Sequence, residues 1–224
     1  MATKKEEIIE IKPIELEEVT IRVRGITPLI EHAWDEKAKR EMLEKQMKTE
    51  SKAKKKEAKN PVSDFINSMY WLTPKPEEMT EEAFENAIAN GARFGFPCTG
   101  FKQATMSGAY RKGWIANKMA LRGELFIVPD GVAHDGTECV EIKGEPPVMR
   151  EDMVKLQGTT SDIRFRGEFR NWYADLRIRY DKNGNYSLSD IVNFFQAGGF
   201  SCGIGEWRAE KDGQNGMFEV VATD

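Results

Sequence analysis

The sequence predicts an α+β fold with a ferredoxin-like core, in which helices pack on an antiparallel sheet. Three observations predict it. Residues 19–24 and 173–180 alternate apolar and polar side chains, which is typical of half-buried strands. A helical stretch follows each of them, at about 99–112 and 187–198, and a final strand is expected at 216–221. This order of strands and helices is the pattern of the ferredoxin-like core.

Local signals place the remaining elements. Further strands are expected at 124–128, 139–143 and 162–169, and further helices at 35–59, 62–72 and 80–90. Thr80 and Thr99 are expected to cap helices, and Gly198 and Gly199 to end one. We therefore predict a single domain over 1–224, with a helical insertion at about 35–90 and a strand-and-loop insertion at about 124–160.

Composition restricts the class of protein. A chain of 224 residues with 40% hydrophobic side chains is long enough for one substantial core. No run of about 18 apolar residues is present, so neither a membrane span nor a signal peptide is expected. Cys98, Cys139 and Cys202 lie far apart and are odd in number, which favours reduced thiols in a cytoplasmic protein.

Charge is sorted along the chain, although the formal net charge is only −4. Residues 37–59 carry ten basic and four acidic side chains, 92–123 carry six basic and no acidic ones, and 156–180 carry five basic and three acidic ones. Such sorting can make one face electropositive. The first block is interpreted either as a solvated helix or as a helix that contacts nucleic acid.

The second block interleaves basic and aromatic residues. Its candidates for binding are Arg93, Phe94, Lys102, Arg111, Lys112 and Trp114. Basic groups bind phosphates and aromatic faces stack on bases. The alternative is that the aromatic rings belong to the core and the basic side chains only cover it. The absence of carboxylates favours binding for the block as a whole.

Arginines alternate with apolar residues in three expected strands. They are Arg22 and Arg24, then Arg164, Arg166 and Arg170, then Arg177 and Arg179. Period-two alternation places the arginines of each strand on one face. If the strands share a sheet, that face becomes an arginine surface that attracts anions. The alternative is an ordinary solvated face.

The segment 198–208 is rich in glycine and ends in Trp207 and Arg208. Successive backbone N–H groups in such a segment can cradle phosphates. It is neither a dinucleotide fingerprint nor a P-loop, because the required strand, helix and Gly-Lys-Ser/Thr contexts are missing. A tight irregular connection is the alternative.

Three segments together resemble the RAMP superfamily, the RRM-like proteins that form the backbone of CRISPR effector complexes. Residues 24–29 (Arg-Gly-Ile-Thr-Pro-Leu) resemble the end of the family's first strand, 96–102 resemble its helix start, and 198–205 resemble its glycine-rich loop. The resemblance implies an RRM-like core and copies that line up on nucleic acid. The short chain and the charged stretch at 37–59 are more similar to a stand-alone relative of the sort that phages and prophages encode.

Signals for catalysis or metal binding are missing. His32 and His134 have no partner at metal-ligand spacing, and the sequence has none of the common nucleophile or zinc motifs. The acidic residues Asp130, Asp135, Glu138 and Glu141 lack the calcium-loop spacing and are interpreted as a surface loop. We therefore expect no catalytic residue, no metal and no cofactor.

The leading hypothesis is a non-enzymatic protein that binds single-stranded nucleic acid with little sequence preference. DNA is favoured over RNA on the resemblance alone, and a homo-oligomer is expected. The alternatives are a homo-oligomeric structural protein without nucleic acid, an RNA-binding CRISPR-related subunit and, less favoured, a nuclease. The expected contacts are Arg22, Arg24, Arg93, Phe94, Lys102, Arg111, Lys112, Trp114, Arg164, Arg166, Arg170, Arg177, Arg179, Trp207 and Arg208.

Overall fold

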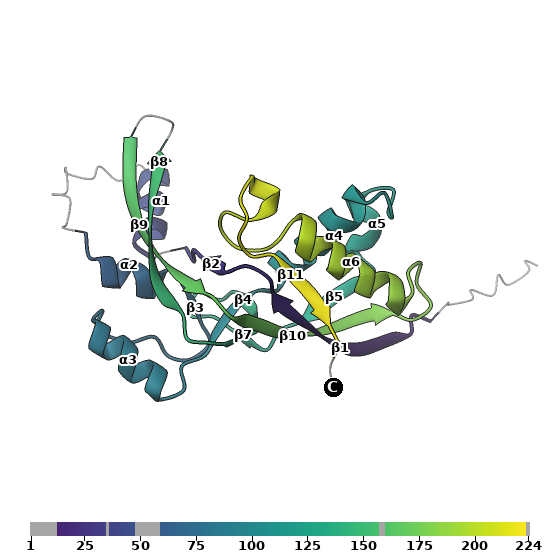
Figure 1. Cartoon of the computed structure of the whole chain (residues 1–224), viewed down its shortest axis with the longest axis horizontal. Coiled ribbons are helices and arrows are strands. Elements are labelled where there is room, and N and C mark those ends of the chain that lie inside the picture. The colour runs from purple at the N-terminus through teal and green to yellow at the C-terminus, as the bar shows by residue number, and fades with distance from the viewer. Residues whose placement is uncertain (1–12, 35, 48–58, 157–159, 223–224) are drawn as a thin grey trace, which may run out of the picture.

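The structure is a computed structural model that describes residues 13–34, 36–47, 59–156 and 160–222. Its fold is a mixed α+β arrangement around a large antiparallel sheet (Figure 1). Among the described residues, none of the helices has the length and apolar character needed to cross a membrane.

The centre of the main sheet has the ferredoxin-like strand order. Strand β1 (Leu16–Gly25) pairs with β11 (Phe218–Val221) on one side and with β10 (Trp172–Asp181) on the other, and β5 (Leu125–Val128) pairs with β10. All of these pairs are antiparallel. Helix α4 (Cys98–Arg111) lies between β1 and β5 in the chain, and α6 (Leu188–Ser201) lies between β10 and β11. The predicted fold class is therefore confirmed.

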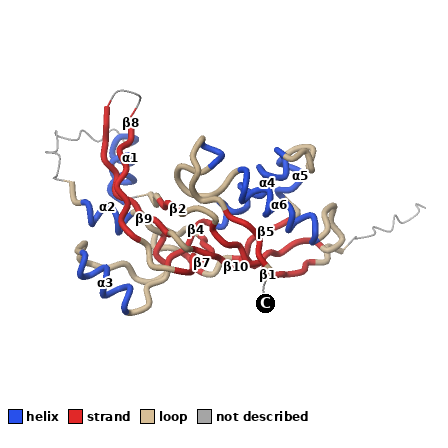
Figure 2. Tube along the Cα trace, in the orientation of Figure 1, coloured by secondary structure: helices blue, strands red, loops and turns tan. Residues whose placement is uncertain are grey.

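Helices α4 and α6 cover one face of this sheet, as Figure 2 shows. Alternate residues of β1 and β10, such as Val23 and Leu176, are fully buried on that face. Phe101 of α4, Phe195 of α6 and Phe218 of β11 are also fully buried and belong to the same core. The period-two pattern of the sequence therefore marks the strands whose inner face carries the helices.

Two stretches of chain extend this centre. Between β1 and α4 lie β2 (Leu29–Glu31), α1 (Glu36–Gln46), α2 (Pro61–Asn67), β3 (Tyr70–Trp71), α3 (Glu81–Ala89) and β4 (Phe94–Pro97). Helix α5 (Lys118–Arg122) lies between α4 and β5. Four strands follow β5: β6 (Gly131–Val132), β7 (Glu138–Gly144), β8 (Val148–Leu156) and β9 (Thr160–Phe169). A short 3-10 helix covers Ala209–Lys211.

These elements enlarge the main sheet and build a second one. Strands β7, β4 and β3 continue the main sheet beyond β10, whereas β2, β9 and β8 form a separate three-stranded sheet. In Figure 1 the β8–β9 hairpin rises at the end of the molecule that also carries α1, α2 and α3. The division into one domain with two insertions stays a prediction.

Several local expectations were wrong. Helix α1 ends at Gln46, and residues 48–58 of the expected long helix lie outside the described residues. The N-cap of α4 is Pro97, without a side-chain hydrogen bond, so Thr99 lies inside the helix. Gly198 and Gly199 are also inside a helix, because α6 continues to Ser201. By contrast Thr80 caps α3, with its Oγ1 accepting from the Ala83 N–H at 3.2 Å.

Candidate nucleic-acid interface

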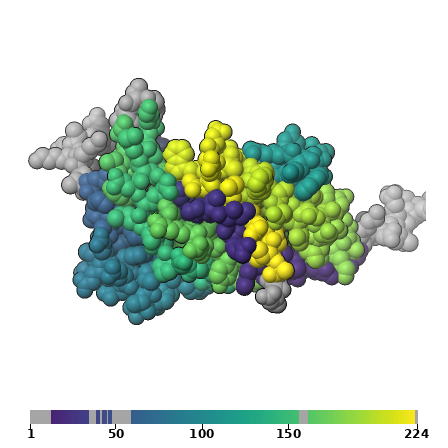
Figure 3. Space-filling model, viewed as in Figure 1, coloured from purple at the N-terminus to yellow at the C-terminus, as the bar shows by residue number. Residues whose placement is uncertain are grey.

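The three segments singled out in the sequence meet at one place in the fold. The Gly216 N–H donates to the Pro28 carbonyl at 2.7 Å, and the Glu206 N–H donates to the Ile30 carbonyl at 2.9 Å. Figure 3 shows the yellow C-terminal residues against the purple segment that follows β1. The start of α4 joins them, because residues 96–104 and 203–210 line one cavity.

This cavity has a volume of about 210 Å³. It is lined by Phe96, Pro97, Thr99, Gly100, Gln103, Ala104, Gly203, Ile204, Gly205, Arg208 and Glu210. We call it the α4-start cavity. Thr99 and Gly100 lie in the first turn of α4, where backbone N–H groups have no partner within the helix. No side chain caps this helix start and its first turn has no acidic residue, so nothing within α4 itself opposes the positive end of the helix dipole. Glu210 is the acidic residue of the cavity lining.

The glycine-rich segment follows a backbone path that requires glycine. Gly203 and Gly205 have φ angles of +67° and +78°, which L side chains rarely adopt. A Cβ at Gly205 would also lie 2.5 Å from the Ile30 carbonyl oxygen. The segment is therefore held tightly against the chain that follows β1, and it brings Arg208 to the cavity wall.

Arg208 and Arg111 flank Glu210. The Arg208 Nη1 donates to the Gly205 carbonyl at 3.1 Å, and its Nη2 lies 3.4 Å from Glu210. The Arg111 Nη1 donates to the Ser201 carbonyl at 2.9 Å, and its Nη2 lies 3.8 Å from the same carboxylate. Two guanidinium groups thus share one carboxylate beside the α4-start cavity, which leaves a surplus of positive charge.

Lys102 lies on the flank of α4 toward β5. Its Nζ is 4.0 Å from the centre of the Phe126 ring, and Phe126 is 52% exposed. Burial, with a smaller contribution from Arg122, lowers the pKa of Lys102. Phe126 was not among the expected contacts, but its exposure has a signal in the sequence: in the run Leu125, Phe126, Ile127, a strand that buries the outer two residues turns the middle one outward.

Lys112, Trp114 and Trp207 are exposed, as a binding role requires. The Trp114 ring lies 6.1 Å from the Phe194 ring. Trp207 has a positive φ of 52° and lies next to Arg208. These three residues, with Lys102, Arg111 and Arg208, form the group of expected contacts that the fold gathers around α4 and the glycine-rich segment.

Phe94 was wrongly assigned to stacking on bases. It is 4% exposed, and its ring lies 4.6 Å from Trp71 and 5.7 Å from Phe169. Phe94 belongs to the short buried strand β4, which the sequence analysis did not anticipate, and its ring is part of the core.

The expectation of an arginine surface was also wrong. Strands β1 and β10 share the main sheet, but β9 lies in the other sheet. Carboxylates accompany the arginines of β1 and β10 on their outer face. Arg22 donates to Asp175 at 2.7 and 3.1 Å, and Asp175 also accepts from Lys143 at 3.0 Å. These contacts lower the pKa of Asp175, with the Arg22 hydrogen bond as the largest cause.

The other outward arginines of the main sheet have carboxylate partners too. The pairs are Arg24 with Glu219, Arg93 with Glu141, Arg177 with Asp130 and Arg179 with Glu18. Each pair joins two strands, or a strand and the loop beside it. Asp130 and Glu141, which were interpreted as parts of an acidic surface loop, thus neutralise arginines of this face. We therefore assign the outer face of the sheet to cross-strand ion pairing.

Arg164 and Arg166 lie in β9 of the β8–β9 hairpin, and Arg170 directly follows that strand. Arg164 is 3.7 Å from Asp162, Arg170 is 2.9 Å from Glu168, and Arg166 is 3.3 Å from Asp152. Arg164 and Arg166 lie in the second sheet with β2, and none of the three arginines lines the α4-start cavity. The expected contacts thus fall into three separate regions.

The three thiols lie inside the fold. Cys98, Cys139 and Cys202 are buried and unbridged. Burial raises the pKa of Cys98 to about 11 and raises that of Cys139 further. Within the described ranges, no three His, Cys, Asp or Glu side chains lie close enough to hold a metal ion.

The fold and site define an α+β protein with a ferredoxin-like sheet and an uncapped helix start beside a glycine-rich segment. No protein-family model and no curated protein matches the chain. Among solved structures, the chain is similar to Cmr6 from Pyrococcus furiosus, with 12% identity over 93% of this chain and 100% of that chain and a TM-score of 0.35. This score is too low to establish a shared fold. Membership of the RAMP superfamily and a phage origin stay predictions.

Proposed function

We propose that the chain is a non-enzymatic protein that binds single-stranded nucleic acid through its phosphates. The observation that carries the proposal is the α4-start cavity. There an uncapped helix start, two glycines with positive φ angles and Arg208 surround a space of about 210 Å³. Helix N-termini and glycine-rich turns are common phosphate sites.

The surroundings of the cavity suit a strand better than a small anion. Arg111 and Lys112 lie at the far end of α4, and Lys102 lies beside the exposed Phe126 ring. The exposed Trp114 and Trp207 rings offer surfaces on which bases stack with little regard for their identity. Successive phosphates would therefore contact the helix start and the cations near α4, and binding would be largely independent of sequence.

The finer points of the proposal rest on the sequence resemblance alone. They are a preference for DNA over RNA, the alignment of several copies along one strand, and a role in phage replication or recombination. The resemblance equally supports an RNA-binding CRISPR-related subunit, so the two polymers must be compared directly.

The test is a fluorescence-anisotropy titration with oligo-dT and oligo-U at low salt. Thr99→Asp would place a carboxylate in the first turn of α4, beside the phosphate. We expect it to weaken binding about tenfold or more by charge repulsion, while it keeps or raises Tm because acids stabilise a helix start. The matched control, Thr99→Ser, should bind as the natural chain does.

Two results would contradict the proposal. One is the absence of binding to both oligonucleotides at low salt. The other is unchanged binding by the Thr99→Asp protein, which would place any nucleic-acid site elsewhere than at the start of α4.

A further inference from the structure

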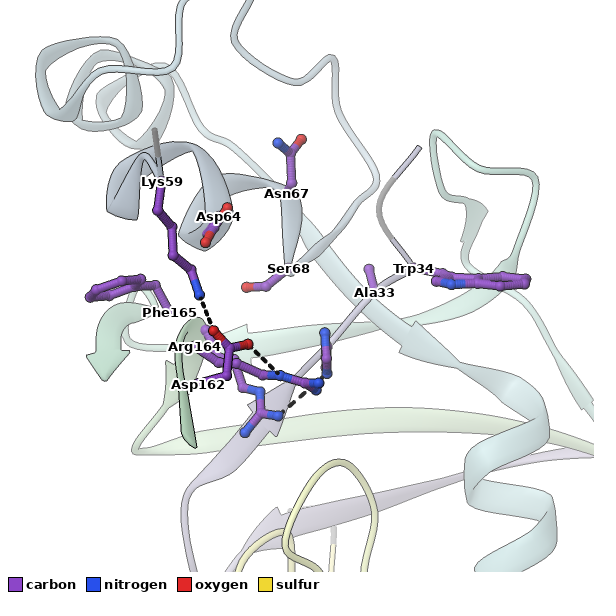
Figure 4. A pocket seen from close by; sticks show the side chains of 11 residues that line it. Ala33, Trp34, Lys59, Asp64, Asn67, Ser68, Asp162, Arg164 and Phe165 are labelled. Atoms are coloured by element: carbon purple, nitrogen blue, oxygen red, sulfur yellow. Dashed lines mark hydrogen bonds and ion pairs between the residues drawn. The ribbon is translucent and has the colours of Figure 1, made fainter. Parts of the chain in front are cut away.

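A second cavity lies beside strand β9 of the β8–β9 hairpin, away from α4. It has a volume of about 450 Å³, is open to solvent and is bordered by the segment after β2, the α2 region and β9 (Figure 4). Its lining residues are His32, Ala33, Trp34, Lys59, Asp64, Asn67, Ser68, Asp162, Arg164, Phe165 and Arg166. We call it the hairpin cavity. Its size is within the range of small-molecule sites.

Cations converge on one side of this cavity. The Lys59 Nζ lies 2.9 Å and the Arg164 Nε 3.7 Å from the two oxygens of Asp162. Figure 4 shows these three side chains pointing toward one another in the centre of the view. Lys59 and Arg164 keep 43% and 33% of their side chains exposed, so both can turn toward a bound anion.

Arg166 supplies a third cation, and its own contacts are incomplete. The side chain is only 3% exposed. Its guanidinium nitrogens lie 3.3 Å from Asp152, 3.5 Å from the His32 Nδ1 and 3.8 Å from Glu206. All three distances are longer than the 2.7–2.9 Å of a strong charge-assisted hydrogen bond. Its Nε is buried with no hydrogen-bond partner among the described residues. An unsatisfied buried donor is costly, and an anion in the cavity would improve the surroundings of this guanidinium.

The other groups of the cavity fit an organic body attached to the anion. Ala33 and Phe165 provide apolar surface, and Asn67 and Asp64 provide polar atoms. The Ser68 hydroxyl is already used, because it donates to the Phe65 carbonyl and accepts from the Gly167 N–H. Burial and the nearby Arg166 lower the pKa of His32, so at neutral pH its ring is uncharged and can hydrogen-bond.

We propose that the hairpin cavity binds the phosphate monoester of a nucleoside, with Lys59, Arg164 and Arg166 on the phosphate and the nucleoside against Ala33 and Phe165. The three cations outnumber the two carboxylates that line the cavity, Asp64 and Asp162, and a phosphate monoester offers them three unbridged oxygens where a phosphodiester offers two. The same group occurs in a free mononucleotide and at the 5′ end of a strand. This site goes beyond the proposed function and does not depend on it.

The first arm of the test uses isothermal titration with AMP, dTMP, adenosine and inorganic phosphate. If the source is a free nucleotide, AMP and dTMP bind and adenosine does not. Arg164→Ala should then weaken AMP binding about tenfold, the effect of losing one hydrogen bond to a charged group. Arg170→Ala is the matched control, because Arg170 directly follows β9 and does not line the cavity.

The second arm compares 5′-phosphorylated with 5′-hydroxyl oligo-dT. If the source is a strand end, the phosphorylated oligonucleotide binds more tightly, and Arg164→Ala removes the difference while Arg170→Ala keeps it. Thermal unfolding checks that both variants fold. The proposal is overturned if AMP and dTMP fail to bind and the 5′ phosphate adds nothing, or if Arg164→Ala changes neither measurement. Loss of oligonucleotide binding with AMP binding retained would overturn only the proposed function.

Discussion

Gly108 of α4 and Gly198 of α6 face each other where the two helices cross. A Cβ on Gly198 would lie 2.7 Å from the carbonyl carbon of Ala104, and one on Gly108 would run into the backbone of Gly198. Both residues are buried. The backbones of the two helices therefore touch, and this contact fixes the position of α4, whose start forms the candidate interface.

Gly198→Ala tests this contact. We expect it to lower the free energy of unfolding by about 1–3 kcal/mol, the usual cost of an overpacked core, even though alanine is the better helix former by about 1 kcal/mol. Chemical denaturation measures the change. Gly123→Ala is the control, since a Cβ there meets nothing within 4 Å and its φ is −92°. If the two variants were equally stable, the close approach of α4 and α6 would be wrong.

The outline of the fold could be predicted because its strands carry clear periodicity. Strands β1 and β10 alternate apolar and polar residues, and the helices after them have recognisable lengths. Short strands such as β2 and β4 were missed because all of their residues are apolar or buried, so no alternation marks them. Gly198 was misread for a related reason, since a glycine that ends a helix and one that lets two helices touch look alike in sequence.

The candidate site could be predicted only in part. The segment around α4 could be singled out as a candidate, because a block without carboxylates is visible in a sequence. The partners of the arginines were not, because they depend on strand register: Arg22 lies directly opposite Asp175 across β1 and β10, residues that are 153 positions apart. Phe94 was misassigned because burial depends on the same pairing.

Glu31 should make stability depend on pH. Its side chain is fully buried, its Oε2 accepts from the Tyr70 N–H at 3.1 Å, and its Oε1 has no partner among the described residues. Burial raises its pKa well above the usual value of 4.5. In the unfolded chain the group ionises above that usual value, whereas the folded state retains the proton. Stability is therefore lost as the pH rises above that value, by about 1.4 kcal/mol per pH unit until the folded pKa is reached.

Glu31→Gln removes this titration. We expect the variant to gain stability over the natural chain between pH 5 and pH 7, and to show little difference near pH 4. Urea denaturation at several pH values measures the two curves. A constant difference between them at every pH would mean that Glu31 does not hold its proton in the folded state.

Salt dependence tests how many cations contact phosphates. With roughly four phosphate contacts per subunit, a plot of the logarithm of affinity against the logarithm of salt concentration should have a slope of about −3. Replacing both Lys102 and Arg111 by alanine should weaken binding and flatten that slope by about 1.4, the value for two contacts with a single strand. Arg179→Ala is the control, because this arginine is paired with Glu18 on the outer face of the sheet.

Two outcomes would locate the site elsewhere. A flat response to salt would contradict a site that follows the backbone of a strand. If replacing Lys54, Lys55 and Lys56 abolished binding while the Lys102 and Arg111 changes were neutral, the basic stretch at 37–59 would be the binding element. These three lysines lie outside the described residues.

Glu210 should limit the affinity for nucleic acid. Its carboxylate lies 3.4 Å from Arg208 and 3.8 Å from Arg111, and it lines the α4-start cavity where the phosphate is expected. Glu210→Gln removes the negative charge, so both guanidinium groups become available and the repulsion of the phosphate disappears. We expect oligonucleotide affinity to rise about threefold to tenfold at low salt, with a smaller gain at higher salt because of screening.

Anisotropy titrations at two salt concentrations measure this change, and Glu85→Gln, on the exposed face of α3, serves as the charge-matched control. An equal gain from both variants would mean that only net charge matters, whereas a loss of affinity on Glu210→Gln would mean that this carboxylate holds the two arginines in their binding positions.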